Sequence, residues 1–360
     1  MNTEWRWLQR FSDQLRLCDL QPSELCVVLS ESSSRPELVS TALLAAQSQG
    51  RDVFQVFMPT PANTGPVPLR STGTTLALQG NPAALAALRR ADFVIDCTVE
   101  GLLHARELRD ILAAETRVLM ISNEDLEVFE RLPHDPDMAR RVELGHEMIR
   151  SAATMRVKSA AGTDLTVRLD GSFTAGSTGV TSGPGSIAHW PGGLVLAFPA
   201  PNTVNGTVVL APGDLNLTFK RYVSTAIRMT VVDDFVTDIT GDGFDSEQLA
   251  SYMRAFNDRD AYASSHIGWG MNPAARWDYL DLYDKTQHNG TEARAFEGNF
   301  MYSTGANENA DRFTSCHFDL PMRECTVELD GVPVVQGGKL QGPLAPPTNP
   351  MDGDEQGRDR

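Results

Sequence analysis

The sequence predicts an α/β N-terminal domain with a mostly parallel sheet, followed by a β-rich α+β C-terminal domain. The chain has 360 residues, which exceeds the size at which one hydrophobic core usually stops growing. Residues 1–150 alternate short apolar runs with longer helix-compatible stretches, whereas residues 151–342 alternate polar and apolar side chains. We therefore expect domains at 1–150 and 151–342, and a disordered Pro-rich and charged tail at 343–360.

The elements of the first domain follow a repeating order in which each strand is followed by a helix. Strands regularly followed by helices favour a parallel sheet, whose ligand crevice lies beyond the carboxyl ends of the strands. The strand in DFVIDCTV would end near Cys97 or Thr98, and it would deliver His104 just past its carboxyl end. In chain order we expect strand 25–30, helix 37–50, strand 52–59, helix 81–91, strand 92–99, helix 104–115 and strand 117–123.

The second domain reads as antiparallel β structure. MRVKSAAGTDLTVRL alternates in period two around a turn at Ala161-Gly162, which is typical of a hairpin. GTVVLAPG, the stretch 217–243 and CTVELDGVPVVQGG continue the same pattern. One helix, SEQLASYMRAFN, interrupts it, and either Asp245 or Ser246 is expected as its N-cap.

Composition excludes several classes of protein. Acidic residues outnumber basic ones by 47 to 31, and the resulting net charge of −16 argues against nucleic acid and against anionic membrane surfaces as partners. The five cysteines form no CxxC pair, which favours a reducing compartment, and we expect a cytoplasmic protein. We find no signal peptide and no apolar run of about 20 residues. No GxGxxG or P-loop pattern occurs in a strand-to-helix context.

Histidines are the first candidates for chemistry. Three of the seven lie in charged or turn contexts and are expected at the surface, namely His134, His146 and His288. The other four lie among Gly, Trp or Pro, a setting that suggests shaped and partly buried backbone, namely His104, His189, His266 and His317. Any one of these four could be a satisfied core histidine, but four together favour a functional site.

The tripeptide His317-Phe318-Asp319 indicates a metal site. In an extended strand, side chains at i and i+2 leave the same face, so His317 and Asp319 can converge on one ion. A third ligand is required, and His266 in SSHIGWG is the best candidate because small neighbours leave room for a substrate. Two imidazoles and a carboxylate are typical of non-haem Fe(II) oxygenases, although a zinc hydrolase can use the same residue types.

At these residues the sequence closely resembles a known family. SHIGWGMNPAARW, EARAFEGNFMYSTGANE and CHFDLPMREC resemble the 2,5-dihydroxypyridine 5,6-dioxygenase family of nicotinic acid breakdown, and LLHARELRDIL and HWPGGLVLAFP extend the likeness. The resemblance implies an α/β domain before a β-rich domain distantly similar to leucyl-aminopeptidase-like metallopeptidases. It implies one Fe(II) per chain on His266, His317 and Asp319, a catalytic base at His104, a pocket histidine at His189, and a homo-oligomer.

The resemblance also implies the reaction. The expected activity is Fe(II)-dependent, extradiol-like cleavage by O2 of a hydroxylated pyridine such as 2,5-dihydroxypyridine, giving an N-formylmaleamate-type product in aerobic catabolism of N-heteroaromatics. Trp190 and Trp269 are expected either to wall the ring or to be ordinary packing, and Ser303 is expected to contact the substrate. One departure concerns the pocket: the chain has no carboxylate between Asp170 and His189, and Ser177 stands where the family has an acid.

Two alternatives remain open at this point. A metallopeptidase-like, metal-dependent hydrolase is favoured by the distant kinship in fold, but a two-metal site needs further bridging carboxylates. The nearby acids that could serve are Glu292, Glu297 and Glu308. A binding or structural protein would instead use the four histidines for packing, which explains neither their settings nor the long matching block.

Overall fold

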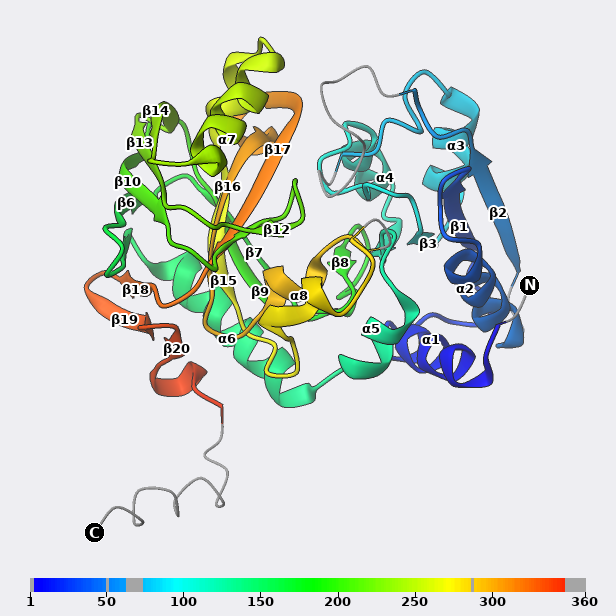
Figure 1. Ribbon diagram of the computed structural model, residues 1–360. Coiled ribbons are helices and arrows are strands. Elements are labelled where there is room, and N and C mark those ends of the chain that lie inside the picture. The colour runs from blue at the N-terminus through cyan, green and yellow to red at the C-terminus, as the bar shows by residue number, and fades with distance from the viewer. Residues whose placement is uncertain (1–2, 50–51, 63–73, 286–287, 347–360) are drawn as a thin grey trace.

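The computed structural model describes residues 3–49, 52–62, 74–285 and 288–346, and it places two units side by side (Figure 1). The first unit is built on a parallel sheet with helices, and the second is rich in antiparallel strands. The predicted fold class is therefore confirmed. Of the expected tail, residues 347–360 lie outside the described residues, and residues 343–346 do not behave as a loose tail, because Leu344 is buried and its carbonyl accepts a hydrogen bond from Arg141.

The N-terminal sheet has five strands in the order β2-β1-β3-β4-β8, and all its pairings are parallel. Each of the four strands expected in this region is present. Three of them are buried throughout, whereas the edge strand over Val53–Met58 is largely exposed. Its strands are β1 (Cys26–Glu31), β2 (Val53–Met58), β3 (Phe93–Asp96), β4 (Arg117–Met120) and β8 (Ile187–His189).

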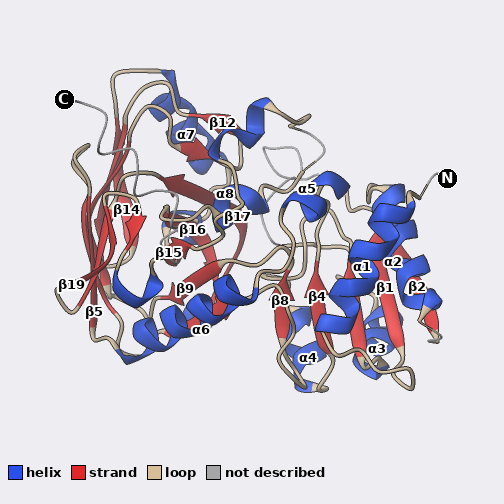
Figure 2. Cartoon of the chain, turned by 90° about the horizontal axis from the view of Figure 1, so that it is seen from below, coloured by secondary structure: helices blue, strands red, loops and turns tan. Residues whose placement is uncertain are grey.

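Helices cover both faces of this sheet (Figure 2). Side chains of α1, α2 and α5 pack with Val28, Phe93 and Leu119 on one face, and side chains of α3 and α4 pack with Val27 and Val94 on the other. This alternation along each strand is the period-two pattern of a doubly covered sheet. The helices are α1 (Trp5–Leu17), α2 (Pro36–Ser48), α3 (Pro82–Arg90), α4 (Glu107–Ala113) and α5 (Leu126–Arg131).

The second unit contains two larger antiparallel sheets, of eight and five strands, in the orders β14-β13-β10-β6-β5-β18-β19-β20 and β17-β16-β15-β9-β7. The eight-stranded sheet comprises β5 (Thr154–Lys158), β6 (Asp164–Arg168), β10 (Val204–Leu210), β13 (Ile227–Val232), β14 (Phe235–Thr240), β18 (Thr326–Leu329), β19 (Val332–Gln336) and β20 (Lys339–Leu340). The five-stranded sheet comprises β7 (Phe173–Ser177), β9 (Leu194–Phe198), β15 (Ser264–Gly270), β16 (Phe300–Asn307) and β17 (Arg312–Met322).

Further strands, helices and 3₁₀ turns complete the second unit. They are β11 (Leu215–Asn216), β12 (Arg221–Tyr222), α6 (Pro136–Ser151), α7 (Phe244–Ala255), α8 (Thr291–Ala295) and the 3₁₀ turns η1 (Arg259–Tyr262), η2 (Trp277–Asp281), η3 (Glu308–Ala310) and η4 (Gly342–Leu344). The predicted N-cap of α7 is wrong: the helix begins at Phe244 with Gly243 as its N-cap. Asp245 instead accepts hydrogen bonds from the backbone of Ser224 and Thr225, which holds the preceding loop against the helix.

Two further differences bear on the site. The helix expected from residue 104 begins at Glu107, so His104 lies in the loop before α4. The strand β8 comes late in the chain but pairs with β4 in the first sheet. The boundary at residue 150 remains a prediction, and β8 shows that a strand beyond it returns to the N-terminal unit.

The five-stranded sheet has one face in the main core and one face toward the first unit. Ile267, Trp269 and Phe318 point into the core that the two antiparallel sheets share, together with residues of the eight-stranded sheet. Because side chains alternate along a strand, His317 and Asp319, on either side of Phe318, must point to the other face. The functional side chains predicted from the sequence therefore face the carboxyl edge of the parallel sheet.

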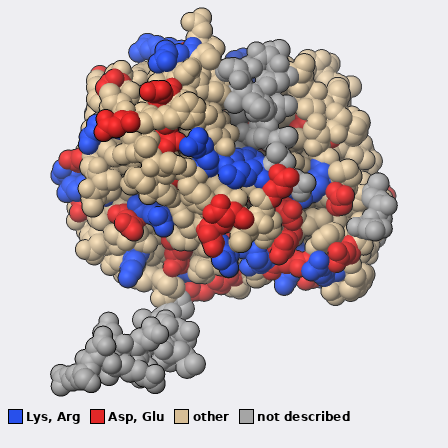
Figure 3. Space-filling view, in the orientation of Figure 1, with Lys and Arg blue, Asp and Glu red and all other residues tan. Residues whose placement is uncertain are grey.

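The exterior agrees with the composition. On the face shown in Figure 3 acidic and basic side chains are interspersed, as expected for a chain with 47 acidic and 31 basic residues. Within the described residues, no helix combines the length and the apolar character that crossing a membrane requires.

Candidate metal centre and cavity

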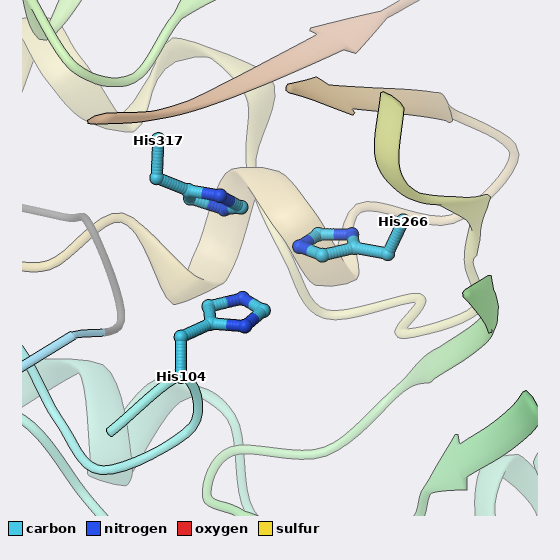
Figure 4. Close-up of side chains that lie close together, drawn as sticks. All are labelled: His104, His266 and His317. Atoms are coloured by element: carbon cyan, nitrogen blue, oxygen red, sulfur yellow. The ribbon is translucent and has the colours of Figure 1, made fainter. Parts of the chain in front are cut away.

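Three histidines meet between the two units. His104 comes from the loop before α4, His266 from β15 and His317 from β17, and their rings point toward one another (Figure 4). One ring nitrogen of each lies within 4.8 Å of the others, and all three residues are buried. The rings of His104 and His266 stack at a centroid distance of 5.8 Å, and that of His317 is 4.8 Å from His104.

Asp319 completes the cluster. Its Oδ1 lies 3.1 Å from Nε2 of His317 and 3.4 Å from Nε2 of His266. Six-coordinate metal ions with bonds of about 2.1 Å hold neighbouring ligand atoms about 3.0 Å apart. These two separations therefore suit three atoms that occupy one face of a metal's coordination sphere.

Ser303 fixes the orientation of two of these side chains. Its Oγ lies 2.5 Å from Oδ1 of Asp319 and 3.1 Å from Nδ1 of His266. Because an ionised carboxylate only accepts, the serine hydroxyl donates to Asp319, and Nδ1–H of His266 donates to the hydroxyl oxygen. This arrangement leaves the lone pair of Nε2 of His266 facing the cluster, which is the form that binds metal.

Arg294, on α8, holds the other oxygen of the carboxylate. Its Nε donates to Oδ2 of Asp319 at 2.5 Å, and its Nη1 donates to Oδ1 of Asn289 at 2.7 Å. Backbone contacts restrain β17 as well, since Leu217 N donates to the carbonyl of Asp319. Oδ1 is thereby left as the oxygen directed at the histidines.

The loop that carries His104 is organised by a buried acid. Asp96, at the end of β3, accepts hydrogen bonds from the backbone N–H groups of Thr98 and Leu102 and from the Thr98 hydroxyl. Burial raises the pKa of Asp96 to about 6. The turn also requires glycine at position 101, where φ is +83° and a Cβ would lie 2.8 Å from Sδ of Met120.

Glu308 pairs with His104 across the boundary between the units. Oε1 of Glu308, at the start of η3, lies 3.2 Å from Nδ1 of His104. Because the carboxylate only accepts, Nδ1 carries the hydrogen, and Nε2 is left as an acceptor. That Nε2 is buried and has no hydrogen-bond partner among the described residues.

Protonation at the cluster matches a cation site. Burial lowers the pKa of His266 well below its usual value, and burial also lowers the pKa of His317 although Asp319 opposes this. Burial acts to raise the pKa of Asp319, but the Arg294 guanidinium and the histidines outweigh it and hold the pKa well below its usual value. Neutral imidazoles and an ionised carboxylate are the forms that bind metal, so the residues present fit an ion such as Fe(II) or zinc.

A cavity of about 460 Å³ adjoins the cluster. Its polar end contains His104, His266, His317 and Asp319, and the rest is mainly apolar. The apolar part is formed by strands of the five-stranded sheet on one side and by α4, β4 and β8 of the first unit on the other, including Leu112, Met120, Ile187, Leu194, Leu196 and Phe198. A polar corner within an apolar pocket is typical of small-molecule sites.

His189 reaches this cavity, as expected for a pocket residue. It ends β8, its Nε2 lies 3.4 Å from Oγ1 of Thr291, and its Nδ1 has no partner among the described residues. Loss of solvent around the ring lowers the pKa of His189 to about 3, with a further contribution from Arg294. The neutral imidazole can therefore donate or accept a hydrogen bond from the cavity wall.

Two other expectations, for Trp190 and Ser303, need correction, and of the two alternatives left open for Trp269 the structure favours packing. Trp190 does not line the cavity; its ring packs on Phe11 and Phe129 in the N-terminal core, at centroid distances of 4.8 and 4.2 Å. Trp269 is likewise a core residue. Ser303 is fully buried beneath the cluster, where it positions Asp319 and His266, and it is not among the described residues that line the cavity.

The histidines expected at the surface also differ from prediction. His288 is buried, and neither ring nitrogen has a partner among the described residues. His146 is half-buried at the cavity, where its Nε2 lies 3.1 Å from the carbonyl oxygen of Thr174. His134 is half-buried as well. Their turn and helix contexts predicted exposure. The prediction failed because other parts of the folded chain cover these three histidines.

Of the acids considered for a two-metal site, two are committed elsewhere. Glu292 forms an ion pair with Arg131 at 2.5 Å and accepts a hydrogen bond from Arg276 N. Glu297 pairs with Arg141 at 3.1 Å. Only Glu308, of these three, reaches the cluster, and it does so through His104.

The role of Arg294 was not predicted from the sequence. It lies 25 residues from Asp319 on a different element, so no local spacing connects the two. The sequence offers one signal, an arginine in the otherwise mixed stretch EARAFEGNF. Arg294 is buried in the structure, where its charge opposes that of the Asp319 carboxylate.

Comparisons with known proteins agree on one family. Residues 6–342 match the profile of the NicX family, described as 2,5-dihydroxypyridine 5,6-dioxygenase. The chain is 37% identical to the 2,5-dihydroxypyridine 5,6-dioxygenase of Pseudomonas putida KT2440 over 340 residues, which cover 93% of this chain and 96% of that protein.

Solved structures give the same result. The 2,5-dihydroxypyridine dioxygenase from Pseudomonas putida KT2440 superposes with a TM-score of 0.88 at 36% identity, covering 93% of this chain and 97% of the other. AmpT from Thermus thermophilus has a TM-score of 0.60 at 14% identity, covering 94% and 99% of the two chains. The second likeness concerns the fold alone.

Proposed function

Because the chain belongs to the 2,5-dihydroxypyridine 5,6-dioxygenase family, whose members are ring-cleaving dioxygenases, we propose that it holds one Fe(II) on His266, His317 and Asp319 and cleaves a hydroxylated pyridine with O2. The product would be of the N-formylmaleamate type, formed by cleavage between C5 and C6 with both oxygen atoms incorporated. The proposal is carried by the approach of Oδ1 of Asp319 to Nε2 of both histidines, at 3.1 and 3.4 Å.

When bound, the ion would act as a Lewis acid on a substrate oxygen and mediate the transfer of electrons from the electron-rich ring to O2. Arg294 and Ser303 would keep the carboxylate fixed while the ion changes its other ligands. Such outer hydrogen bonds orient the ligands and raise metal affinity.

His104 is assigned the role of general base. Its Nε2 faces the cluster as an acceptor because Nδ1 is occupied by Glu308, so it would take the proton of a substrate hydroxyl as that oxygen becomes an anion. Glu308 would stabilise the imidazolium that forms. His104 would therefore act from the first unit, across from the ligands on β15 and β17, while Glu308 holds it from the second unit.

His189 is assigned to substrate orientation. It lies on the cavity wall with one ring nitrogen unpaired, which suits a hydrogen bond to the second ring substituent or to a ring-derived oxygen. The apolar side chains around it would exclude bulk water and so strengthen these polar interactions.

The proposal is tested by loading the protein with ferrous ion under anaerobic conditions and then supplying 2,5-dihydroxypyridine and O2. We expect one ferrous ion per chain and one O2 consumed per ring cleaved, with a product mass equal to substrate plus O2. Two zinc ions per chain with peptidase activity would favour the hydrolase reading instead. Failure to bind any metal would contradict both.

A further inference from the structure

One wall of the cavity is an apolar row that the metal chemistry does not use. Leu194, Leu196 and Phe198 point from the same face of β9, and with Met301 they form a buried cluster separate from the large cores. The alternate residues of β9, Val195 and Ala197, belong to the main core. Because β9 already buries its other face, this row borders the cavity without a partner layer of its own.

The row leads away from the histidines. The ring centroid of Phe198 is 5.5 Å from that of His266 and 6.4 Å from that of His104. Phe198 is therefore the residue of the row that lies next to the proposed metal site. Leu194 lies four residues away along β9, which corresponds to about 13 Å in an extended strand. The apolar surface thus continues well beyond the point at which a ring bound at the metal would end.

The volume is also larger than a bare ring requires. A cavity of about 460 Å³ falls within the range of about 300–1,000 Å³ that encloses drug-sized ligands. Phe173 lies at the edge of the row, where its ring centroid is 5.8 Å from that of Phe198. Its side chain is 53% exposed. An unsubstituted dihydroxypyridine bound at the metal end would leave the cavity beside Leu194 without an apolar ligand contact.

Charge does not favour a polar extension along this row. Of the described residues that line the cavity, the carboxylates and the guanidinium are Asp319, Glu100 and Arg294, and none lies on β7 or β9. Arg294 is paired with Asp319 in the cluster. Ser177, at the end of β7, accepts a hydrogen bond from the backbone N–H of His189 and donates to its carbonyl. The hydroxyl is therefore occupied, and the wall beside Leu194 is neutral.

We propose that the substrate is a hydroxylated pyridine that carries an apolar alkyl or aryl substituent, which lies along Leu194, Leu196 and Phe198 while the ring hydroxyl faces the histidines. This inference rests on the proposed ring cleavage and specifies its substrate class. Burial of the substituent adds binding energy remote from the reacting atoms, and this energy raises kcat/KM.

The test compares 2,5-dihydroxypyridine with its 3-propyl and 4-propyl derivatives by O2 uptake on the ferrous protein. Each buried methylene is expected to raise kcat/KM about fourfold, so the better propyl compound should exceed the parent by about 60-fold. If the parent ring is cleaved with a kcat/KM equal to or above that of both derivatives, the inference is overturned and the proposed function stands.

A substitution beside the row tests whether the substituent lies there. Ala175 on β7 pairs with Leu196 and packs against the apolar cluster, so Ala175→Phe would fill the space beside it. The propyl-to-parent ratio of kcat/KM is expected to fall by at least tenfold in this variant. Phe244→Ala, at an exposed site on α7, serves as the control that keeps the ratio. An unchanged ratio in Ala175→Phe would overturn the assignment to this row.

Binding without turnover separates the two proposals. Propyl-substituted 2-hydroxypyridine lacks the 5-hydroxyl, and its affinity relative to 2-hydroxypyridine can be measured by titration calorimetry on the ferrous protein under anaerobic conditions. A preference for the propyl compound that Ala175→Phe abolishes supports the apolar site even if no compound is cleaved, an outcome that would sink only the proposed ring cleavage. Equal affinities would overturn the site itself.

Discussion

Nδ1 of His104 lies 3.2 Å from Oε1 of Glu308, although the two residues are 204 positions apart. His104 belongs to a loop at the carboxyl edge of the parallel sheet, and Glu308 belongs to the turn between two strands of the antiparallel sheet. The assigned base is therefore assembled only when the two units pack together. The carboxylate decides which imidazole nitrogen carries the hydrogen, and so which one can accept a proton.

The pairing of Glu308 with His104 predicts that substitutions of Glu308 lower activity to different degrees. Glu308→Ala should lower kcat about 10–100-fold with bound iron unchanged, because the His104 ring loses its tautomer and orientation. Glu308→Gln should retain more activity, since its amide oxygen still accepts from Nδ1. Steady-state O2 uptake with metal analysis measures both. The exposed Glu147→Gln is the control, and a wild-type kcat in Glu308→Ala would remove the residue from the mechanism.

Substitutions of the metal ligands and of the base should differ in their effect on bound iron. Replacing His266, His317 or Asp319 with Ala should abolish both bound iron and turnover, because each removes one of three ligands. His104→Ala should keep iron but lower turnover by about 100-fold or more, as expected on loss of a general base. Metal analysis after anaerobic loading distinguishes the two groups. Stoichiometric iron in two of the three ligand variants would refute the ligand set, as would loss of iron in His104→Ala.

Much of this site follows from local pattern. The strand β3 and the loop after it were predictable because an apolar run must be buried and must end at polar residues. The shared face of His317 and Asp319 was predictable because strand side chains alternate. Both inferences use only neighbours in sequence, and the structure has both features.

The remainder depends on packing between distant segments. Trp190 looked like a ring wall beside glycines, but it is buried against Phe11 on the first helix, which no local pattern indicates. Ser303 looked like a substrate contact, but the register of β16 with β17 sets it opposite Asp319. Arg294 and Glu308 act on residues 25 and 204 positions away. Such contacts are fixed by tertiary structure, which spacing does not encode.

Arg294 should matter for metal affinity more than its distance from the metal suggests. Its guanidinium binds Oδ2 of Asp319 and Oδ1 of Asn289 at once, and the single ammonium of lysine cannot reproduce this fork. Arg294→Lys should weaken iron binding about 10–100-fold, measured by competition with a chelator. Arg276→Lys, which changes an exposed pair with Asp278, is the matched control. Equal affinities in the two variants would show that Asp319 needs no such support.

His288 should make the fold sensitive to acid. Burial lowers the pKa of His288 to about 3, with further contributions from Lys220 and Arg35, whereas the unfolded chain titrates near the usual value of about 6.5. Below about pH 6.5 the unfolded state therefore binds a proton that the folded state does not, and the free energy of unfolding falls until about pH 3. Between pH 7 and pH 5 this single group accounts for a loss of about 2 kcal/mol.

The measurement is urea unfolding of wild type and His288→Leu at both pH values. The leucine variant fills the same buried site without a titrating group, so its free energy of unfolding should fall by about 2 kcal/mol less between pH 7 and pH 5 than that of wild type. The comparison uses differences within each protein, which cancels any change in packing that leucine introduces. Identical pH dependence in the two proteins would mean that His288 takes up a proton in the folded state as readily as in the unfolded chain.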